Sequence, residues 1–361
     1  MTLLRSLFDV GAATPLTVRD DIVTSSRVMG DWSGMGAGSI PLEADYSASY
    51  EEIATRQLWV RIVVNKLAYA IGRLPLKVYA RAGDNSRSRV TDTELAALLR
   101  RPNASKETGT PAGFKARLGY DLMVYANALI VKVQTRPDRV PTELRPVSPR
   151  GWRIEDGEYV HIFETDGRET RVPSWRMIHI TEPGPTARGF GVSRLEAARL
   201  TLAVEYAAQR LGVSTFHNGA RPSSIINVKT APSGGNDAVE RFKREVVTKL
   251  GGVNRAGSPA VLEGDIDWKS IAFNLDGSAV VEHRHLTREE VAALYDIPQP
   301  AIGILDEANF ASVDALHIMF YQDSLTWPIR LIEENLGAQL IAGVPEFENQ
   351  FVEFDLNAVM R

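Results

Sequence analysis

The 361-residue sequence contains no cysteine, and it has only six histidines. Disulfide bonds, thiolate metal sites and cysteine nucleophiles are therefore excluded, which suits a protein assembled in a reducing cytoplasm. Walker loops and the GxGxxG, GxSxG and HExxH motifs are also absent from the sequence. Because the sequence shows no set of catalytic residues at the spacing of a known motif, it favours a binding or structural role over an enzymatic one. We expect neither a cofactor nor a metal.

Long hydrophobic runs are missing as well. No apolar stretch approaches the roughly 20 residues that a membrane helix needs, and the start, Met1 to Phe8, has too short an apolar stretch for a signal peptide. Hydrophobic residues make up 44% and charged residues 24% of the chain, which is the composition of an ordinary globular protein. We therefore expect a soluble protein that is made in the cytoplasm and has no membrane partner.

The sequence has no excess of basic charge of the kind that supports tight binding to nucleic acid. The net charge is −4, whereas proteins that bind DNA by neutralising phosphates usually carry a basic surplus. Residues 270–361 contain no lysine, and from Leu305 onward ten carboxylates face only two arginines. The simplest interpretation of this acidic final region is an ordinary solvated surface.

The first half of the chain predicts an α+β fold. Residues 9–48 are rich in Gly, Ser, Ala and Asp without a sustained period, which indicates an arm ordered at most by a neighbour. Helical periods then give way to short strands between turns, an order typical of α+β rather than alternating α/β proteins. The predicted helices are 50–71, 93–99 and 113–127, and the predicted strands are 74–79, 128–133, 143–144, 158–164 and 177–180.

The second half predicts two long helices that flank a small mixed insert. The first helix runs from Ser193 to about Phe216, and Ser193 and Glu196 have capping-box spacing. The second starts near residue 276 or 278 and reaches Tyr295. Between them the pattern predicts a βαββ insert with strand 224–228, helix 236–250 and strands 260–262 and 267–270.

A turn at 297–303 and a loop at 304–312 lead into a last long helix that ends near Ile341. Pro328 lies inside this helix. Because proline lacks the backbone N–H and its ring clashes with the carbonyl four residues back, we expect a kink near Ser324.

Candidate metal ligands are few and poorly arranged. His283 and His285 occupy alternate positions, which point apart on a helix. Asp265 and Asp267 form a possible carboxylate pair, as do Asp306 and Glu307, although each pair fits a turn or a solvated face better. One alternative function is a metal-dependent DNA-processing enzyme, a nuclease, that uses Asp265 and Asp267. A ring-forming adaptor protein is a further alternative, which the length of the chain disfavours. His161 and His179 lie in apolar strands and read as core residues.

An ordered series of short motifs spans residues 59–341. The segments are Ile71–Tyr79 at the end of 59–79, Leu98–Asn103 (LLRRPN), Asp121–Ala128, Gly189–Leu195 (GFGVSRL), Phe216–Pro222 (FHNGARP), Ile297–Gly303 and Leu325–Glu333. This series resembles the portal proteins of long-tailed bacteriophages. It departs from the family at Ala126, where glycine is usual, and at Arg194, where proline is usual.

The resemblance implies a ring, usually of twelve copies, at the portal vertex of the virion. Its implied partners are double-stranded DNA, the large terminase, a head–tail adaptor and the major capsid protein. The implied parts are an N-terminal arm (1–48), a wing (49–192), a first stem helix (193–218), a clip (219–275), a second stem helix (276–296), a turn and tunnel loop (297–313), a kinked wing helix (314–345) and a C-terminal segment that is a minimal crown (346–361).

The resemblance also implies candidate site residues. Arg284 and Arg288 would make weak contacts with DNA, although Arg284 is equally suited to bridge neighbouring subunits. Phe310 would project toward the duplex or pack under its own loop. The tunnel-loop candidates are Asp306, Glu307, Asn309 and Phe310. The clip helix would dock the packaging motor or the adaptor through its basic residues, or these residues would belong to an ordinary solvated face. The basic residues are Arg241, Lys243, Arg244 and Lys249. The kink is assigned to Pro328.

Overall fold

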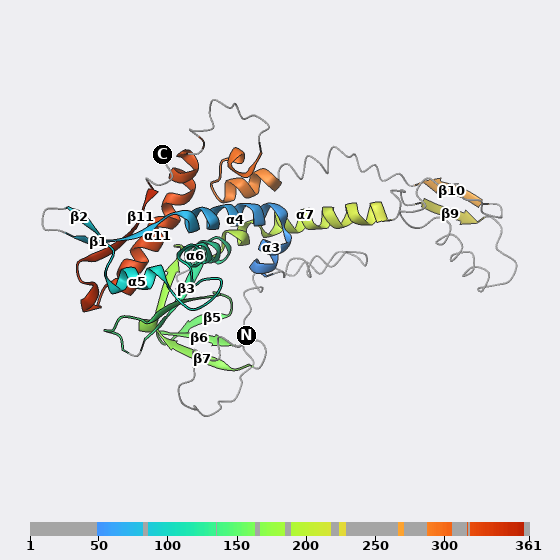
Figure 1. Cartoon of the computed structure of the whole chain (residues 1–361). Helices are drawn as coiled ribbons and strands as arrows, with labels where there is room; N and C mark the ends of the chain where they lie inside the picture. The colour runs from blue at the N-terminus through green and yellow to red at the C-terminus, as the bar shows by residue number, and fades with distance from the viewer. Residues whose placement is uncertain are drawn as a thin grey trace. The chain divides into compact units, whose positions relative to one another are not determined.

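The computed structural model describes residues 49–81, 86–134, 136–162, 167–184, 189–217, 224–228, 266–270, 287–304, 316 and 318–356. Contacts divide the chain into one unit of residues 1–199 with 289–361 and a second unit of residues 200–288. Helices and antiparallel sheets make up the first unit (Figure 1). The predicted α+β class is thereby confirmed.

The first unit contains two long helices that pack against each other. They are α4 (Leu58–Arg73) and α6 (Pro111–Tyr125), which lie side by side in Figure 1. Glycine allows the close approach, because a Cβ at Gly119 would lie 3.1 Å from Ala68 Cα. Both helices begin and end within two residues of the predicted bounds at all but one end. That end is the start of α4, because the extended backbone of Gln57 separates it from the short helix α3 (Tyr50–Arg56).

Three antiparallel sheets complete the first unit, with strand orders β11-β1-β2, β4-β3-β8 and β5-β6-β7. The central strand β3 is buried at every position but the last. Four strands were missed by sequence reasoning, namely β2, β5, β7 and β11. The bounds are β1 Leu76–Arg81, β2 Arg87–Val90, β3 Asn127–Val133, β4 Glu143–Val147, β5 Trp152–Glu155, β6 Glu158–Ile162, β7 Glu169–Pro173, β8 Met177–Thr181 and β11 Gln350–Phe354.

The C-terminal helices depart from a continuous α-helix. Residues 287–294 are helical. The predicted last helix is α-helical at residues 318 and 319, changes to the π-helix η5 (Phe320–Leu325) and continues as α11 (Thr326–Leu336). The change coincides with Pro328, which cannot donate to the carbonyl of Ser324. The Thr326 hydroxyl donates instead to the carbonyl of Tyr321 at 3.2 Å. The change of helix type lies where a kink is predicted, and the kink itself stays a prediction.

Short elements fill the remaining connections of the first unit. They are α5 Glu94–Arg100, the 3₁₀ helices η1 Ser174–Arg176, η3 Gln299–Ile302 and η7 Pro345–Phe347, and the π-helix η6 Gly337–Ile341.

The second unit contains an antiparallel pair of strands, β9 (Ser224–Val228) and β10 (Ile266–Ser270). Both strands confirm the prediction. The helix α7 (Arg194–His217) begins in the first unit and continues into the second, as predicted for the first long helix. The predicted helix 236–250, the predicted strand 260–262 and the predicted helical residues 276–286 lie outside the described residues.

Candidate functional site

Most of the predicted site residues lie outside the described residues. These are the tunnel-loop, clip-helix and Arg284 candidates, together with Asp265, His283 and His285. Arg288 lies half-buried in the helix 287–294. Asp267 lies on β10, where its backbone is opposite Asn227. Among the described residues, no group of three or more His, Asp or Glu side chains is placed to hold a metal ion. None of the described helices is long and apolar enough to cross a membrane.

Several polar contacts of the described residues meet at the N-terminal end of α7. Arg194, the first residue of that helix, donates to both carboxylate oxygens of Glu182, at 2.8 and 3.3 Å. It also donates to the carbonyl of Leu294 at 3.2 Å and lies 3.5 Å from Asp296. Its guanidinium carbon is 5.8 Å from the centre of the Tyr295 ring. One arginine therefore ties the start of α7 to the end of the helix 287–294.

The last carbonyls of α6 join the same junction. The Tyr295 hydroxyl donates to the carbonyl of Met123 at 2.9 Å, and the Ser193 hydroxyl donates to that of Val124 at 2.6 Å. These carbonyls lie in the last turn of α6, where helical partners run out. Burial raises the pKa of Tyr295 far above its ordinary value, so this phenol stays a donor. Side chains directly before α7 and directly after the helix 287–294 thus cap α6.

The predicted capping box at Ser193 is wrong in detail. The Ser193 hydroxyl accepts from the N–H of Leu195 rather than from Glu196. The Glu196 carboxylate is engaged by the Tyr50 hydroxyl at 2.9 Å and by Arg199 at 2.9 Å. The reason is tertiary, because α3 brings Tyr50 to the side of α7 and offers Glu196 a partner outside its own helix.

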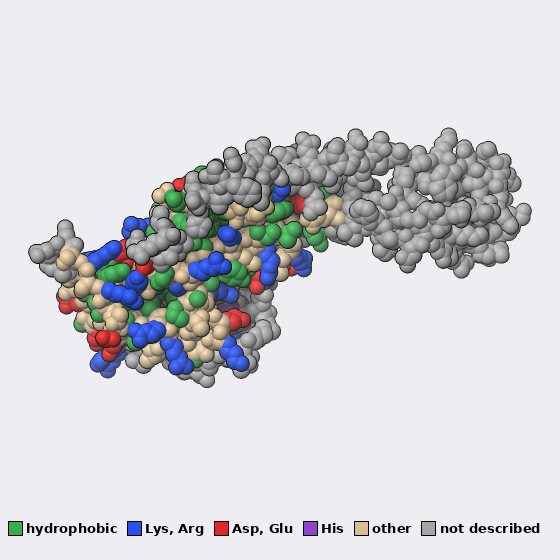
Figure 2. All heavy atoms as spheres, turned by 45° about the horizontal axis from the view of Figure 1, so that its top comes forward, with side chains coloured by type: hydrophobic (Ala, Val, Ile, Leu, Met, Phe, Trp, Pro, Cys, Tyr) green, Lys and Arg blue, Asp and Glu red, His purple; other side chains and the backbone are tan. Residues whose placement is uncertain are grey.

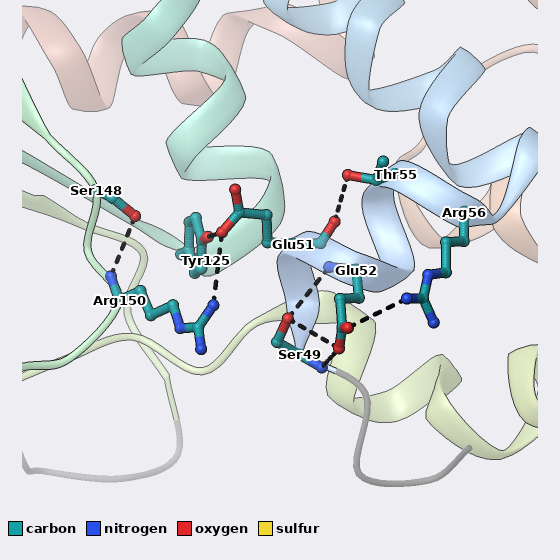
Figure 3. A network of polar contacts seen from close by, with 8 residues as sticks. All are labelled: Ser49, Glu51, Glu52, Thr55, Arg56, Tyr125, Ser148 and Arg150. Carbon is teal, nitrogen blue, oxygen red and sulfur yellow. Dashed lines mark hydrogen bonds and ion pairs between the residues drawn. The ribbon is translucent and has the colours of Figure 1, made fainter. Parts of the chain in front are cut away.

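The actual capping box is at the start of α3 (Figure 3). The N–H of Ser49 donates to the Glu52 carboxylate at 3.0 Å, and the N–H of Glu52 donates to the Ser49 hydroxyl at 3.2 Å. On the other side of α3, Glu51 accepts from the Tyr125 hydroxyl at 3.5 Å and lies 3.9 Å from Arg150. These contacts fix α3 against α6 and the loop before β5.

Asn127 is the centre of a buried network that holds the segment before α7. Its side-chain oxygen accepts from the N–H of Gly191 at 2.8 Å and from Thr181 at 3.0 Å. Its amide nitrogen donates to the carbonyls of Gly191 and Tyr125 at 2.9 and 2.6 Å. The Asn127 side chain thus holds the Gly-Phe-Gly motif in place through Gly191.

His179 extends this network into the sheet. Its Nε2 lies 3.0 Å from the Asn127 oxygen, which can only accept, so Nε2 carries the proton and Nδ1 accepts from the Tyr159 hydroxyl at 3.0 Å. Burial lowers the pKa of His179 to about 4. The backbone of His179 is bound on both sides by the Gln339 side chain, at 2.8 Å each. His179 is a core residue with its hydrogen bonds satisfied, as the sequence indicated.

Asp121 is the buried acid of the Asp-Leu motif. Its side chain has no exposed surface, and it accepts from Arg117 at 2.8 Å. Burial raises the pKa of Asp121 to about 7, while Arg117 opposes the shift. Its role is structural, because Arg117 ties it to its own helix one turn earlier.

An open groove of about 1020 Å³ lies beside the junction. Its walls come from the turn after the helix 287–294 and from the outward face of η5 and α11. Trp327 and Met319 contribute apolar surface and are each about half exposed, at 49% and 48%. Sequence reasoning missed this groove, although Trp327 stands beside the proline that it did identify. The lining residues are Ala293, Asp296, Ile297, Pro298, Met319, Gln322, Asp323, Thr326, Trp327, Arg330 and Glu334.

Comparison with known proteins identifies relatives over most of the chain. A family model described as phage portal protein matches residues 59–361. The probable portal protein of Streptomyces phage phiC31 is 24% identical over 317 residues, which are 82% of this chain and 66% of that protein.

Solved structures agree with these relatives. A chain from the neck of an empty GTA particle is 25% identical with a TM-score of 0.60, over 84% of this chain and 82% of that one. An HK97 family phage portal protein from Corynebacterium diphtheriae has a TM-score of 0.62 at 14% identity, over 86% and 96% of the two chains. The latter similarity concerns the fold alone.

Proposed function

The chain belongs to the phage portal protein family, and from this premise we propose that it forms the channel at one capsid vertex through which double-stranded DNA enters and leaves. The observation that carries the proposal is the family match over residues 59–361. The family is structural rather than enzymatic. The similarity to chains from the necks of GTA particles supports a place at the portal vertex, between capsid and tail.

The proposed assembly is a closed ring of twelve copies. Ring closure needs two different faces of the subunit, each complementary to the other. The similar neck computed with C12 symmetry supports this number. In this proposal, the major capsid protein surrounds the ring, and a head–tail adaptor binds it from outside.

The second contact unit supports the proposed clip. Residues 200–288 separate from the rest of the chain, and they contain the described strands β9 and β10. We assign 219–275 to the clip and the flanking helices 193–218 and 276–296 to the stem. The clip would dock the large terminase and later the adaptor through its basic helix, at Arg241, Lys243, Arg244 and Lys249.

DNA must slide through such a channel, so tight contacts with its phosphates would slow its movement. The lysine-free, acid-rich region after residue 270 suits a wall that repels phosphate. The loop with Asp306, Glu307, Asn309 and Phe310 would face the duplex. Arg284 and Arg288 would contribute transient contacts to the phosphates.

The ring is tested by light scattering on the purified protein. We expect a single species of about 480 kDa, the mass of twelve chains of 39.8 kDa. A stable monomer under assembly conditions would contradict the proposal.

The loop assignment has its own test, in a DNA packaging assay with the cognate motor. Glu307→Lys should slow packaging several-fold, because it adds a phosphate contact to the sliding path. Glu307→Gln is the matched control and should package nearly normally. If Glu307→Lys packages at the normal rate, the loop does not face DNA, and the family assignment is unaffected.

A further inference from the structure

The outer face of α4 is cationic and partly apolar. The helix has 16 residues, with Arg61, Lys66 and Arg73 as its cations and no acidic residue. Leu58 and Tyr69 are 55% and 57% exposed. Figure 2 shows Lys and Arg side chains next to exposed hydrophobic ones on the described surface. Because residues at i, i+3 and i+4 share a helix face, these side chains form one stripe.

The groove has the opposite character. Asp296, Asp323 and Glu334 line it with a single cation, Arg330, around the apolar surface of Met319 and Trp327. An aromatic residue in an apolar centre with a charged rim is the usual anatomy of a protein–protein interface.

Two cations of α4 and two carboxylates of the groove have no ion-pair partner in the part of the chain that the structure describes, whereas Asp296 lies 3.5 Å from Arg194. Among the described residues, no ion pair involves Arg61 or Arg73 on α4. The same holds for Asp323 and Glu334 in the groove, where Arg330 pairs with Glu333, at 3.8 Å, outside the lining. Each surface therefore carries charge that the other can neutralise.

The two surfaces consist of different residues of the first unit. Phe320 of η5 is buried, and Lys66 of α4 lies 5.7 Å from its ring centre. The groove residues Met319 and Asp323 are exposed on the outward side of the same helical segment. The groove thus opens on the face of this segment that is turned away from the core. A contact between α4 of one copy and the groove of a second copy is heterologous when the α4 of the second copy enters the groove of a third, and this type of contact closes into a ring.

We propose that the outer face of α4 in one copy docks into the Trp327 groove of the next copy. This proposal rests on the proposed function, because it supplies one contact of the ring. Tyr69 and Leu58 would lie against Trp327 and Met319. Arg61 and Arg73 would lie against the groove carboxylates.

Cross-linking gives the direct test, because the chain has no cysteine of its own. The variant with Tyr69→Cys and Trp327→Cys is purified as the assembled particle and treated with a short bis-maleimide. A heterologous contact joins every copy to the next, so we expect a ladder of covalent multimers on a denaturing gel. Each single variant should give no cross-link. A control pair, Tyr69→Cys with the exposed Arg153→Cys on β5, should give no ladder.

Charge reversal gives the second measurement. Arg73→Glu and Asp323→Arg should each reduce the ring fraction at fixed concentration about tenfold, because each places like charges together. The double variant should recover most of the ring, which a fold defect in either single variant would not allow. Both positions are exposed, so a thermal melt should show folded subunits in every variant.

The outcomes separate this proposal from the ring itself. If the unmodified protein is a ring but the cysteine pair gives no ladder, or either single cysteine variant gives dimers, the docking of α4 into the groove is overturned while the ring stands. If the charge-reversed single variants assemble normally, the docking is overturned in the same way. If the unmodified protein is a monomer, the proposed function itself fails.

Discussion

At the scale of single residues, Arg194 makes more tertiary contacts than its place in the sequence indicates. Arg194 departs from the portal motif, in which proline is usual at this position. In the structure it binds Glu182 with two hydrogen bonds and reaches Leu294 and Asp296 from the next helix. Sequence reasoning could not find this role, since its partners are about 12 and 100 residues away.

Replacing Arg194 tests this role. Arg194→Ala should lower the free energy of unfolding by about 2 kcal/mol, because the mostly buried Glu182 carboxylate loses its charged donor. Arg56→Ala removes an exposed ion pair at 3.5 Å and should cost less than about 0.5 kcal/mol. Urea unfolding of both variants measures the two values. Equal losses would mean that the Arg194 junction contributes no more than a surface pair.

His179 predicts a pH dependence of stability. Its pKa is about 4 in the folded protein against 6.5 for an unperturbed histidine. Between these values the unfolded chain binds a proton that the folded protein does not, so stability falls as the pH is lowered. The full loss is about 3 kcal/mol, reached near pH 4.

The measurement is unfolding of the unmodified protein and of His179→Gln between pH 7 and pH 4. Glutamine keeps a donor for Asn127 but does not titrate, so the stability of the variant should fall less over this range. Comparing the two proteins cancels the titration of other groups, Asp121 included. Parallel pH profiles would show that His179 is not held neutral by the fold.

At the scale of elements, periodicity predicted the long helices and the buried strands well. The runs that became α4, α6, α7 and β3 each have a clear apolar period or a continuous apolar stretch. The strands β2 and β7 are short and contain charged residues, and only β2 is mostly exposed, whereas β7 buries Val172. β11 was missed for a different reason, because it pairs with β1 from the far end of the chain. Local sequence carries no record of such a partner.

The Asn127 clamp makes a sharp prediction about glycine. A Cβ at Gly191 would lie 2.5 Å from the carbonyl of Glu182 and 2.7 Å from that of Ala126. Gly191→Ala should therefore destabilise the protein by about 3 kcal/mol or more, because backbone atoms at the base of α7 would have to move. Thermal unfolding measures the change.

Gly337 is the matched control, because a Cβ there would meet nothing within 4 Å. Its backbone is helical, so Gly337→Ala should stabilise the protein by up to about 1 kcal/mol. If Gly191→Ala behaves like Gly337→Ala, the clamp around Gly191 is looser than described.

At the scale of the whole molecule, the ordered motifs identified the family, and the family match confirmed it. Two of these motifs contact each other in the fold. Asn127 and Gly191 bind each other across 64 residues. The groove beside Trp327 could not be predicted from the sequence, because its walls come from the turn after the helix 287–294 and from residues 319–334, which meet only in the fold.

The central claim is that copies of this chain surround a hole. Electron microscopy of the purified protein in negative stain tests it most directly. The account predicts end-on views of a ring with a central bore wide enough for a DNA duplex. Particles that are compact in every view, without a bore, would contradict it.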